Sequence, residues 1–574
     1  MRIAPTKPGR LSRPSLSTWR WAAGARRAFG VALAVLAAQG AGPVRGEVNP
    51  EHWAAFESAS FRMLSDGHSE AATRILLDLE RFRRAFTELA PGIDASFPVP
   101  TQLVAFRDAA SYAPFKSERD TAETKILGQF LGHRDGNYIT LDADPRWSGS
   151  LGVIIHEYVH HVINQNLPRV PRWLNEGLAE YYSTFGVEGR YAVIGRPVER
   201  HLRWWRLNSE ASISTVLSEA AGASIHSQGD AGRFYAVSWA LAHYLLSQPQ
   251  GPDLLASYLE AVATGAEATD ALLLALGVSV GGLEAELRGY IAAESMPATA
   301  LALDDLGEIE IVETEASPAD TLAVLAELAA RIGNPRHAEE LLYLALDYEP
   351  ENADVLASLA SLREDQGRFE EAGVLYADAL ARGPALARSY LRCGRYLLGA
   401  IERTRPLSAE SAENLARRAK ALFLVAAELD PLFAEAQVAL AYVHLFDGLD
   451  AGDGLVFSER ARELLPTRPD VVHSLIRLHL KLGAIDRADE LVEGPLGVLA
   501  DSDFQAKVRD EVRRADLLLA ARAALSEGRW EDGIELFDRA IAHTESDEVR
   551  LQMEEQLDRL SERADLERRG GGSR

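Results

Sequence analysis

The sequence contains a single cysteine, Cys393, among its 574 residues. It therefore has no intrachain disulfide framework and no metal site built from several thiolates. Basic residues are outnumbered by acidic ones, 60 against 85, and the net charge of −25 argues against a nucleic-acid partner. The content of 47% hydrophobic and 25% charged residues is typical of globular proteins, and the length predicts two or three domains.

Residues 1–46 are predicted to form an export segment. Residues 1–27 are basic and contain no acidic residue, and residues 28–38 form the short apolar run AFGVALAVLAA. This is the order of a signal peptide, and no other stretch is long and apolar enough to span a bilayer. We expect a mature chain that starts near residues 41–47 in the periplasm or cell envelope of a bacterium. Two adjacent arginines resemble a twin-arginine signal, so the signal type and its cleavage stay open, as does a disordered extension on a cytoplasmic protein.

The stretch His156-Glu157-Tyr158-Val159-His160 lies in an apolar run with helical period. Residues four apart share one face of a helix, so His156 and His160 can reach one metal ion together. Glu157 would flank a water molecule at this ion and accept its proton. This is the H-E-x-x-H zinc motif. His161 points about 100° away around the helix and is expected to pack rather than to ligate. The alternative is a helix with ordinary histidines and a solvated glutamate.

A second segment, Trp173-Leu174-Asn175-Glu176-Gly177-Leu178-Ala179-Glu180, offers a third ligand. A catalytic zinc takes three protein ligands and keeps one open position. Glu176, early on a second predicted helix, can supply the third ligand. Glu180 lies one turn later on the same face, where it can accept the remaining ring N–H of a ligand histidine.

Together, HEYVH and PRWLNEGLAEYY resemble the gluzincin metallopeptidases, and most closely the bacterial peptidase MA-like superfamily. The resemblance implies a Zn²⁺ ion held by His156, His160 and Glu176. It also implies that Glu157 is the general base, and it puts Glu180 where some gluzincins keep an acidic residue behind the ligands. It runs from about residue 55 to residue 292. We therefore expect an α+β zincin-like metallopeptidase domain over residues 50–292.

Two further roles rest on the same resemblance. The strand Tyr138-Ile139-Thr140 precedes the metal helix and is expected to be a sheet edge with which an extended peptide can pair. The alternative is that Tyr138, Ile139 and Thr140 lie in an interior strand. Tyr235, near the start of a helix predicted over 231–247, could donate a hydrogen bond to the reaction's oxyanion. His243 competes for that role, and packing of either side chain in the core is an equal alternative.

The surrounding pattern predicts strands at 60–64, 101–106, 137–141 and 191–194 and helices at 69–89 and 108–117. Residues 186–225 look irregular apart from the last of these strands. They contain a basic cluster that could bind an anionic substrate group or pair with nearby acids, formed by Arg196, Arg200, His201, Arg203 and Arg206.

The C-terminal half carries a repeat. Residues 293–318 are acidic and are predicted to be a linker. From residue 319, landmark residues recur at a spacing of 34: Gly333 and Gly367, Ala338 and Ala372, Pro350 and Pro384. This spacing is the tetratricopeptide repeat (TPR) pattern. We expect an all-α superhelix over 319–568, with about six helix pairs, a capping helix and the tail 569–574. Its concave face would receive a protein partner, and a passive spacer is the alternative.

The predicted function is that of a zinc-dependent metallopeptidase. It would hydrolyse peptide bonds of protein or peptide substrates, while the repeats recruit substrate or a partner. Two alternatives stay open: a non-catalytic TPR scaffold with a degenerate peptidase-like domain, and a zinc amidohydrolase acting on a cell-wall or other non-protein amide. The choice between endopeptidase and exopeptidase action, the substrate and the oligomeric state are not predicted.

Overall fold

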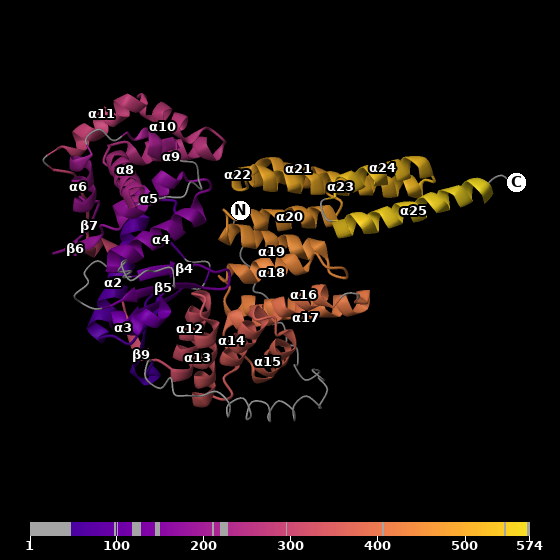
Figure 1. Ribbon diagram of the computed structural model, residues 1–574, viewed down its shortest axis with the longest axis horizontal. Coiled ribbons are helices and arrows are strands. Elements are labelled where there is room, and N and C mark those ends of the chain that lie inside the picture. Colours follow the sequence, from indigo (N-terminus) through magenta and orange to yellow (C-terminus); the bar gives the residue numbers. More distant parts are fainter. Residues whose placement is uncertain are drawn as a thin grey trace, which may run out of the picture.

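The computed structural model describes residues 48–570 except 97–98, 100, 117–127, 144–149, 209–211, 219–227, 294, 405–406 and 545–546. Figure 1 shows a front domain, coloured indigo to magenta, beside an array of helix pairs that continues to the yellow C-terminus. The fold is mostly helical, with one larger mixed sheet and one small sheet. The predicted export segment lies outside the described residues.

The larger sheet has the strand order β4-β5-β3-β2-β1-β9. Strands β2, β3 and β5 run parallel, whereas β4 pairs antiparallel with β5, and β1 pairs antiparallel with both β2 and β9. The strands are Ala54–Glu57 (β1), Arg62–Ser65 (β2), Thr101–Phe106 (β3), Gly128–Leu131 (β4), Asn137–Asp142 (β5) and Val312–Glu315 (β9). The strands expected at 101–106 and 137–141 therefore form within one residue of their predicted bounds.

Both faces of the central strand β3 are buried. Leu103 and Ala105 of β3 pack in one core with helices α2 (Ser69–Leu89) and α4 (Ser150–Asn166). Val104 and Phe106 face the opposite side and share a second core with the first helices of the array. Successive side chains of a strand point to opposite faces, so a strand covered on both sides reads as an unbroken apolar run.

The second half of the front domain is helical and packs closely around α5. Its helices are α5 (Arg172–Tyr182), α6 (Glu199–Leu207), α7 (Ser214–Ser218), α8 (Gln228–Leu246), α9 (Gly251–Ala263), α10 (Ala268–Leu276) and α11 (Val280–Ile291). A Cβ atom on Gly177 would lie 2.3 Å from the carbonyl oxygen of Ser238, so only glycine lets α5 and α8 approach this closely. The glycine of the E-G pair therefore brings the helix of Glu176 against the helix of Tyr235.

The segment expected to be irregular, 186–225, also contains regular structure. Besides α6 and α7 it forms β6 (Gly186–Glu188), which pairs with β7 (Tyr191–Ile194). Helix α6 was missed because only His201 and Trp205 of its side chains are buried and three of its nine residues are arginines.

The acidic segment 293–318, predicted to be a linker, instead contributes strands to both sheets. Strand β8 (Thr299–Ala302) pairs with β7, and β9 pairs with β1. All four residues of β9 are exposed. Because the strand adds main-chain hydrogen bonds at a sheet edge and buries no side chain, its composition resembles that of a linker.

The array contains six helix pairs among the described residues, as the repeat spacing predicts, and ends in α25. The helices are α12 (Pro318–Arg331), α13 (Pro335–Tyr348), α14 (Ala353–Asp365), α15 (Phe369–Arg382), α16 (Ala387–Arg403), α17 (Ala409–Leu429), α18 (Ala434–Val443), α19 (Ala451–Leu464), α20 (Pro469–Lys481), α21 (Ile485–Leu491), α23 (Ser502–Ser526), α24 (Trp530–Ala542) and α25 (Asp547–Gly570), with the short α22 (Gly497–Leu499) after α21. Gly333 and Gly367 turn the chain inside the first two pairs at φ of 90° and 74°, a conformation that favours glycine.

Cys393 is buried in α16, and burial raises the pKa of its thiol, so it behaves as a small apolar residue.

No single helix within the described ranges has the length and hydropathy of a membrane span. The pair α10 and α11 reaches that length together, across a bend of 66°.

Candidate metal centre

Three ligand atoms from two helices converge on one point. His156 and His160 lie one turn apart on α4, with their Nε2 atoms 3.0 Å from each other. The Oε2 atom of Glu176, on α5, lies 3.5 Å from His156 Nε2 and 3.4 Å from His160 Nε2. We call these three residues the metal centre. The structure thus brings together the three predicted ligands, which are the one such group found among the described residues.

The metal centre fits a zinc ion by its dimensions and its donor set. Tetrahedral zinc with bonds of about 2.0–2.1 Å places its ligand atoms about 3.3 Å apart, close to the three distances observed. Two imidazole nitrogens and a carboxylate oxygen are ligands that zinc accepts. Glu176 Oε2 is also buried without a hydrogen-bond partner. A buried carboxylate oxygen in that state is costly unless a cation completes it.

Polar groups lie behind both ligand rings, and one of them forms a hydrogen bond. His160 donates from Nδ1 to Asn175 Oδ1 at 2.9 Å, which leaves the lone pair of Nε2 facing the centre. His156 Nδ1 lies 3.9 Å from Glu180 Oε1. Glu180, expected behind one of the two ligand histidines, thus lies nearest to His156. The contact of Asn175 was missed, although it directly precedes Glu176.

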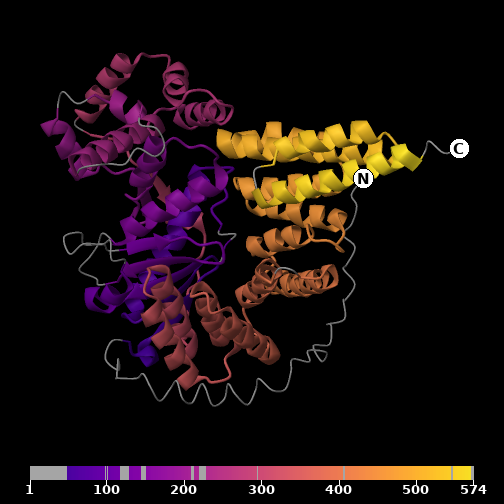
Figure 2. The same ribbon diagram turned by 45° about the vertical axis from the view of Figure 1, so that its right-hand side comes forward.

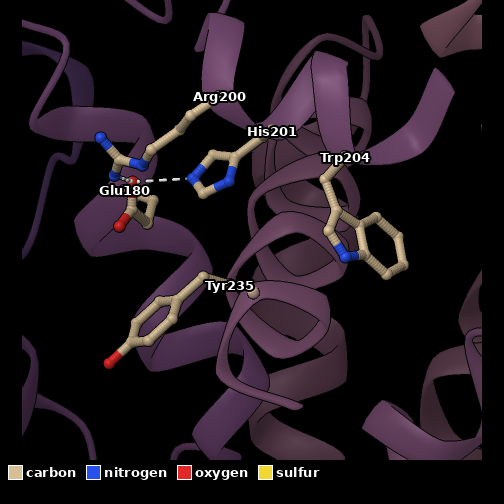
Figure 3. Close-up of a pocket in the computed structure, with 6 residues that line it drawn as sticks. Glu180, Arg200, His201, Trp204 and Tyr235 are labelled. Atoms are coloured by element: carbon tan, nitrogen blue, oxygen red, sulfur yellow. Dashed lines mark hydrogen bonds and ion pairs between the residues drawn. The ribbon is translucent and has the colours of Figure 1, made fainter. Parts of the chain in front are cut away.

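Glu180 is itself held by two residues of α6. Arg200 Nη2 donates to Glu180 Oε2, and His201 Nε2 lies 3.0 Å from the same oxygen, as Figure 3 shows. Burial acts to raise the pKa of Glu180, but His201 and Arg200 outweigh it and lower the pKa below its usual value. The basic cluster thus pairs with acids, because Arg206 also bonds Glu199 at 2.8 Å. This was the second of its two predicted roles.

The charges of the metal centre stabilise one another. Burial acts to raise the pKa of Glu176, but the imidazoles of His156 and His160 outweigh burial and lower it to about 2. Burial acts to lower the pKa of His160, but Glu176 and Asn175 outweigh burial and raise it. The pocket therefore favours an ionised carboxylate next to positive charge, which is the electrostatic environment that a bound cation requires.

Glu157 and Tyr235 lie near this centre. Glu157 is half-buried on α4, and its charge helps to raise the pKa of both His160 and Tyr235. Burial and then Glu176 are the larger causes for Tyr235, whose pKa rises to about 12. Tyr235 lines a cavity of about 290 Å³ together with Glu180, Arg200, His201, Trp204 and Gly232. In Figure 3 the Tyr235 and Glu180 side chains both extend to the left of the view, away from Trp204.

His243 does not share the position of Tyr235. Its side chain is buried, with Nε2 2.9 Å from the Gly195 carbonyl and Nδ1 2.7 Å from the Tyr290 hydroxyl. Both ring nitrogens are thus engaged within the core of the front domain. Burial lowers the pKa of His243. For His243 this is the packing alternative, whereas Tyr235 lines the cavity beside Glu180.

The predicted substrate strand is not a sheet edge. Strand β5, which contains Tyr138, Ile139 and Thr140, is bonded to β3 on one side and to β4 on the other. Strand β4, only four residues long, is the end of the sheet among the described residues. The short Gly-Gln-Phe-Leu segment of β4 shows too little alternation of polar and apolar residues to be recognised as a strand. The sheet edge was therefore assigned to β5 instead of β4.

His161 packs, as expected for its direction on the helix. Its ring lies 5.4 Å from the Phe130 ring of β4, and burial lowers its pKa to about 4. A neutral, packed imidazole beside the edge strand fills space next to the metal centre and adds no ligand.

Residues 132–293 match a family model described as Peptidase MA superfamily, and no curated protein matches the chain. Among solved structures, the chain is similar to YrrB, a TPR protein with an unusual peptide-binding site, at 15% identity over 33% of this chain and 91% of that one (TM-score 0.28). It is also similar to a thermophilic TPR protein of Thermus thermophilus (20% identity, 35% and 100% covered, TM-score 0.27) and to PilF of Pseudomonas aeruginosa (18%, 42% and 97%, TM-score 0.27). The family expected from the two motifs is confirmed: the chain carries a peptidase MA superfamily domain and TPR repeats.

Proposed function

We propose that this protein is a zinc-dependent metallopeptidase whose front domain is a zincin of the gluzincin type. The observation that carries the proposal is the triangle of His156 Nε2, His160 Nε2 and Glu176 Oε2, with edges of 3.0, 3.4 and 3.5 Å. These residues would hold zinc. When bound, zinc acts as a Lewis acid that polarises a substrate carbonyl and makes a water molecule more acidic.

The chain's own residues then divide the work. The Glu157 carboxylate would take the proton of the attacking water and pass it to the leaving amine. Tyr235, whose pKa of about 12 keeps its hydroxyl protonated at neutral pH, would donate a hydrogen bond to the oxygen on which negative charge develops. Asn175 would keep the imidazole of His160 in the tautomer that presents Nε2, and the Glu180 carboxylate would favour a proton on Nδ1 of the nearby His156.

The proposal includes a binding mode and a location. An extended peptide would pair with β4, the end strand beside α4, through main-chain hydrogen bonds. The substrate would be a protein or peptide of the bacterial cell envelope, an assignment supported by the signal-like order of residues 1–46.

The test is the variant Glu157→Gln in the full-length chain. It keeps the size of the side chain but removes the base. We expect full zinc content with peptide hydrolysis reduced about 10³-fold or more, measured on a quenched-fluorescent peptide library. Zinc content within error of the wild type with unchanged turnover would remove Glu157 from the mechanism. Wild-type protein that binds zinc but cleaves only non-peptide amides would favour the amidohydrolase.

A further inference from the structure

The turn between β4 and β5 inserts an acidic side chain into the array. Asp135 is buried, with Oδ1 2.9 Å from Arg331 Nη2 of α12 and Oδ2 2.7 Å from both Nε and Nη2 of Arg392 of α16. Burial acts to raise the pKa of Asp135, but the neighbouring cations outweigh burial and hold it well below its usual range. The partner of these arginines is thus a side chain of the same protein.

The next strand continues the contact. Tyr138 of β5 donates from its hydroxyl to Glu327 Oε2 of α12 at 2.6 Å. Glu327 also bonds Arg392 Nη1 at 2.8 Å and Arg388 Nη1 at 3.3 Å. We call Asp135, Glu327, Arg331, Arg388 and Arg392 the interdomain ionic cluster. Its residues on the array come from α12 and α16, and Ser358 of α14 donates to Glu327 Oε1 at 2.9 Å.

A second contact lies later in the array, next to α20. Thr467, just before α20, donates from its hydroxyl to the carbonyls of Asn164 and Gln165 at 2.8 and 3.1 Å. These carbonyls belong to the last turn of α4, where helix carbonyls lack intrahelical partners. Figure 2 shows the array curving from the sheet at one end to the region above α4 at the other.

Arg169, in the loop that joins the two ligand helices, forms further hydrogen bonds to the array. Its Nη2 donates to the carbonyls of Gly497 and Ala500 at 2.7 Å each. Its backbone has φ of 55°, the one positive φ of a residue other than glycine among those described. Such a conformation costs free energy for a residue with a side chain, and its surroundings have to hold it in place.

This second contact leads to a ligand in three steps. Thr467 bonds the backbone of Asn164, whose side-chain Oδ1 accepts from Asn175 Nδ2 at 3.3 Å. Asn175 Oδ1 accepts from Nδ1 of His160 at 2.9 Å. The end of α4, the start of α5 and the array are therefore linked through side chains that also orient a ligand ring.

We propose that the repeat array acts as an intramolecular clamp on the metal centre, with Thr467 and Arg169 as positioning residues. The surface of the array that forms these contacts is bound to the front domain of the same chain. The clamp fixes α4 against α5 and thereby sets the separation of His160 from Glu176. This inference rests on the proposed zinc site. It differs from the predicted partner on the concave face, because α12 and α16 of the array already bind Asp135 of the front domain.

The test uses the full-length chain and the zinc affinity measured by competition with a chromophoric chelator. Thr467→Val removes the hydroxyl and keeps the shape, and Arg169→Ala removes the hydrogen bonds of Arg169 to the array. Each is expected to weaken zinc binding, and the double variant about tenfold, the lower end of the range for residues that orient ligands. The matched controls are Thr404→Val at the exposed end of α16 and Arg382→Ala in an exposed pair with Asp378. Both should bind zinc as the wild type does.

Two further readouts separate positioning from folding. The visible absorption bands of the cobalt-loaded protein report ligand geometry, and they should shift in Thr467→Val and not in Thr404→Val. Arg169→Gly relaxes the backbone but also removes these hydrogen bonds, so it should weaken zinc binding as Arg169→Ala does, while Arg169→Lys should restore part of it. Wild-type affinity and spectrum in Thr467→Val and Arg169→Gly would overturn the clamp. Absence of zinc from the wild type would instead overturn the proposed function.

Discussion

The metal centre and the interdomain ionic cluster both hold ionisable side chains away from bulk water, but they satisfy them differently. In the interdomain ionic cluster, Asp135 and Glu327 each bond two arginines. In the metal centre, Glu176 Oε2 faces two imidazoles and has no hydrogen-bond partner. Buried carboxylates that are matched by cations stabilise architecture, and a buried carboxylate left incomplete is available for a ligand. The two clusters should therefore respond to substitution in opposite ways.

After Glu157→Gln, the largest effect on the rate of hydrolysis should come from Tyr235→Phe. The substitution removes one hydroxyl on α8 and no packing atom. We expect kcat to fall about 10²-fold, with KM, zinc content and melting temperature nearly unchanged, because the hydrogen bond is formed to the transition state. Steady-state kinetics measure kcat and KM, and differential scanning calorimetry measures the melting temperature. Tyr191→Phe, at an exposed position of β7, is the control and should leave all values unchanged. A lower melting temperature of Tyr235→Phe together with an unchanged kcat would show that Tyr235 is a packing residue.

Asp135→Asn should lower the stability of the fold and leave the metal ligands in place. It removes a carboxylate from two largely buried arginines, of which Arg392 keeps Glu327, and it should cost about 3 kcal/mol of unfolding free energy. Urea unfolding followed by circular dichroism measures this loss. Asp304→Asn, the same substitution in an exposed pair with Arg190, should cost at most about 0.5 kcal/mol. Equal losses in the two variants would show that the interdomain ionic cluster contributes no more than a surface ion pair.

The residues of the metal centre could be predicted from the sequence, whereas those of the interdomain ionic cluster could not. His156, Glu157 and His160 follow from a five-residue spacing on one helix, and Glu176 from a motif close by in sequence. The interdomain ionic cluster joins Asp135 to Arg392, 257 residues apart, and no local pattern announces such a contact. Sequence periodicity reports which face of an element is buried, and it does not report against what.

The errors have the same origin. Strand β4 is too short to show alternation, so β5 was taken for the edge. Strand β9 buries no side chain, so its segment was taken for a linker. Glu180 and Arg200 are 20 residues apart in the sequence. Several basic residues lie in that region, and the sequence does not show which of them pairs with Glu180.

A smaller effect should appear in the acid stability of the wild type and Asp135→Asn. The pKa of Asp135 is below its usual range in the folded state, so its contribution is complete above the unfolded value of about 4 and is lost as pH falls below it. Between pH 4 and pH 3, the unfolding free energy of the wild type should therefore fall about 1 kcal/mol per pH unit more steeply than that of Asp135→Asn. Parallel slopes in urea titrations would show that Asp135 is not held ionised.

The most direct test of the metal centre is the zinc content of the full-length chain by inductively coupled plasma mass spectrometry. The full chain is required because the face of β3 that contains Val104 and Phe106 is covered by the array. We predict one zinc per chain in the wild type and in His161→Ala, and none in His156→Ala or Glu176→Ala. Wild-type protein without zinc after reconstitution, or zinc retained by both ligand variants, would contradict the account.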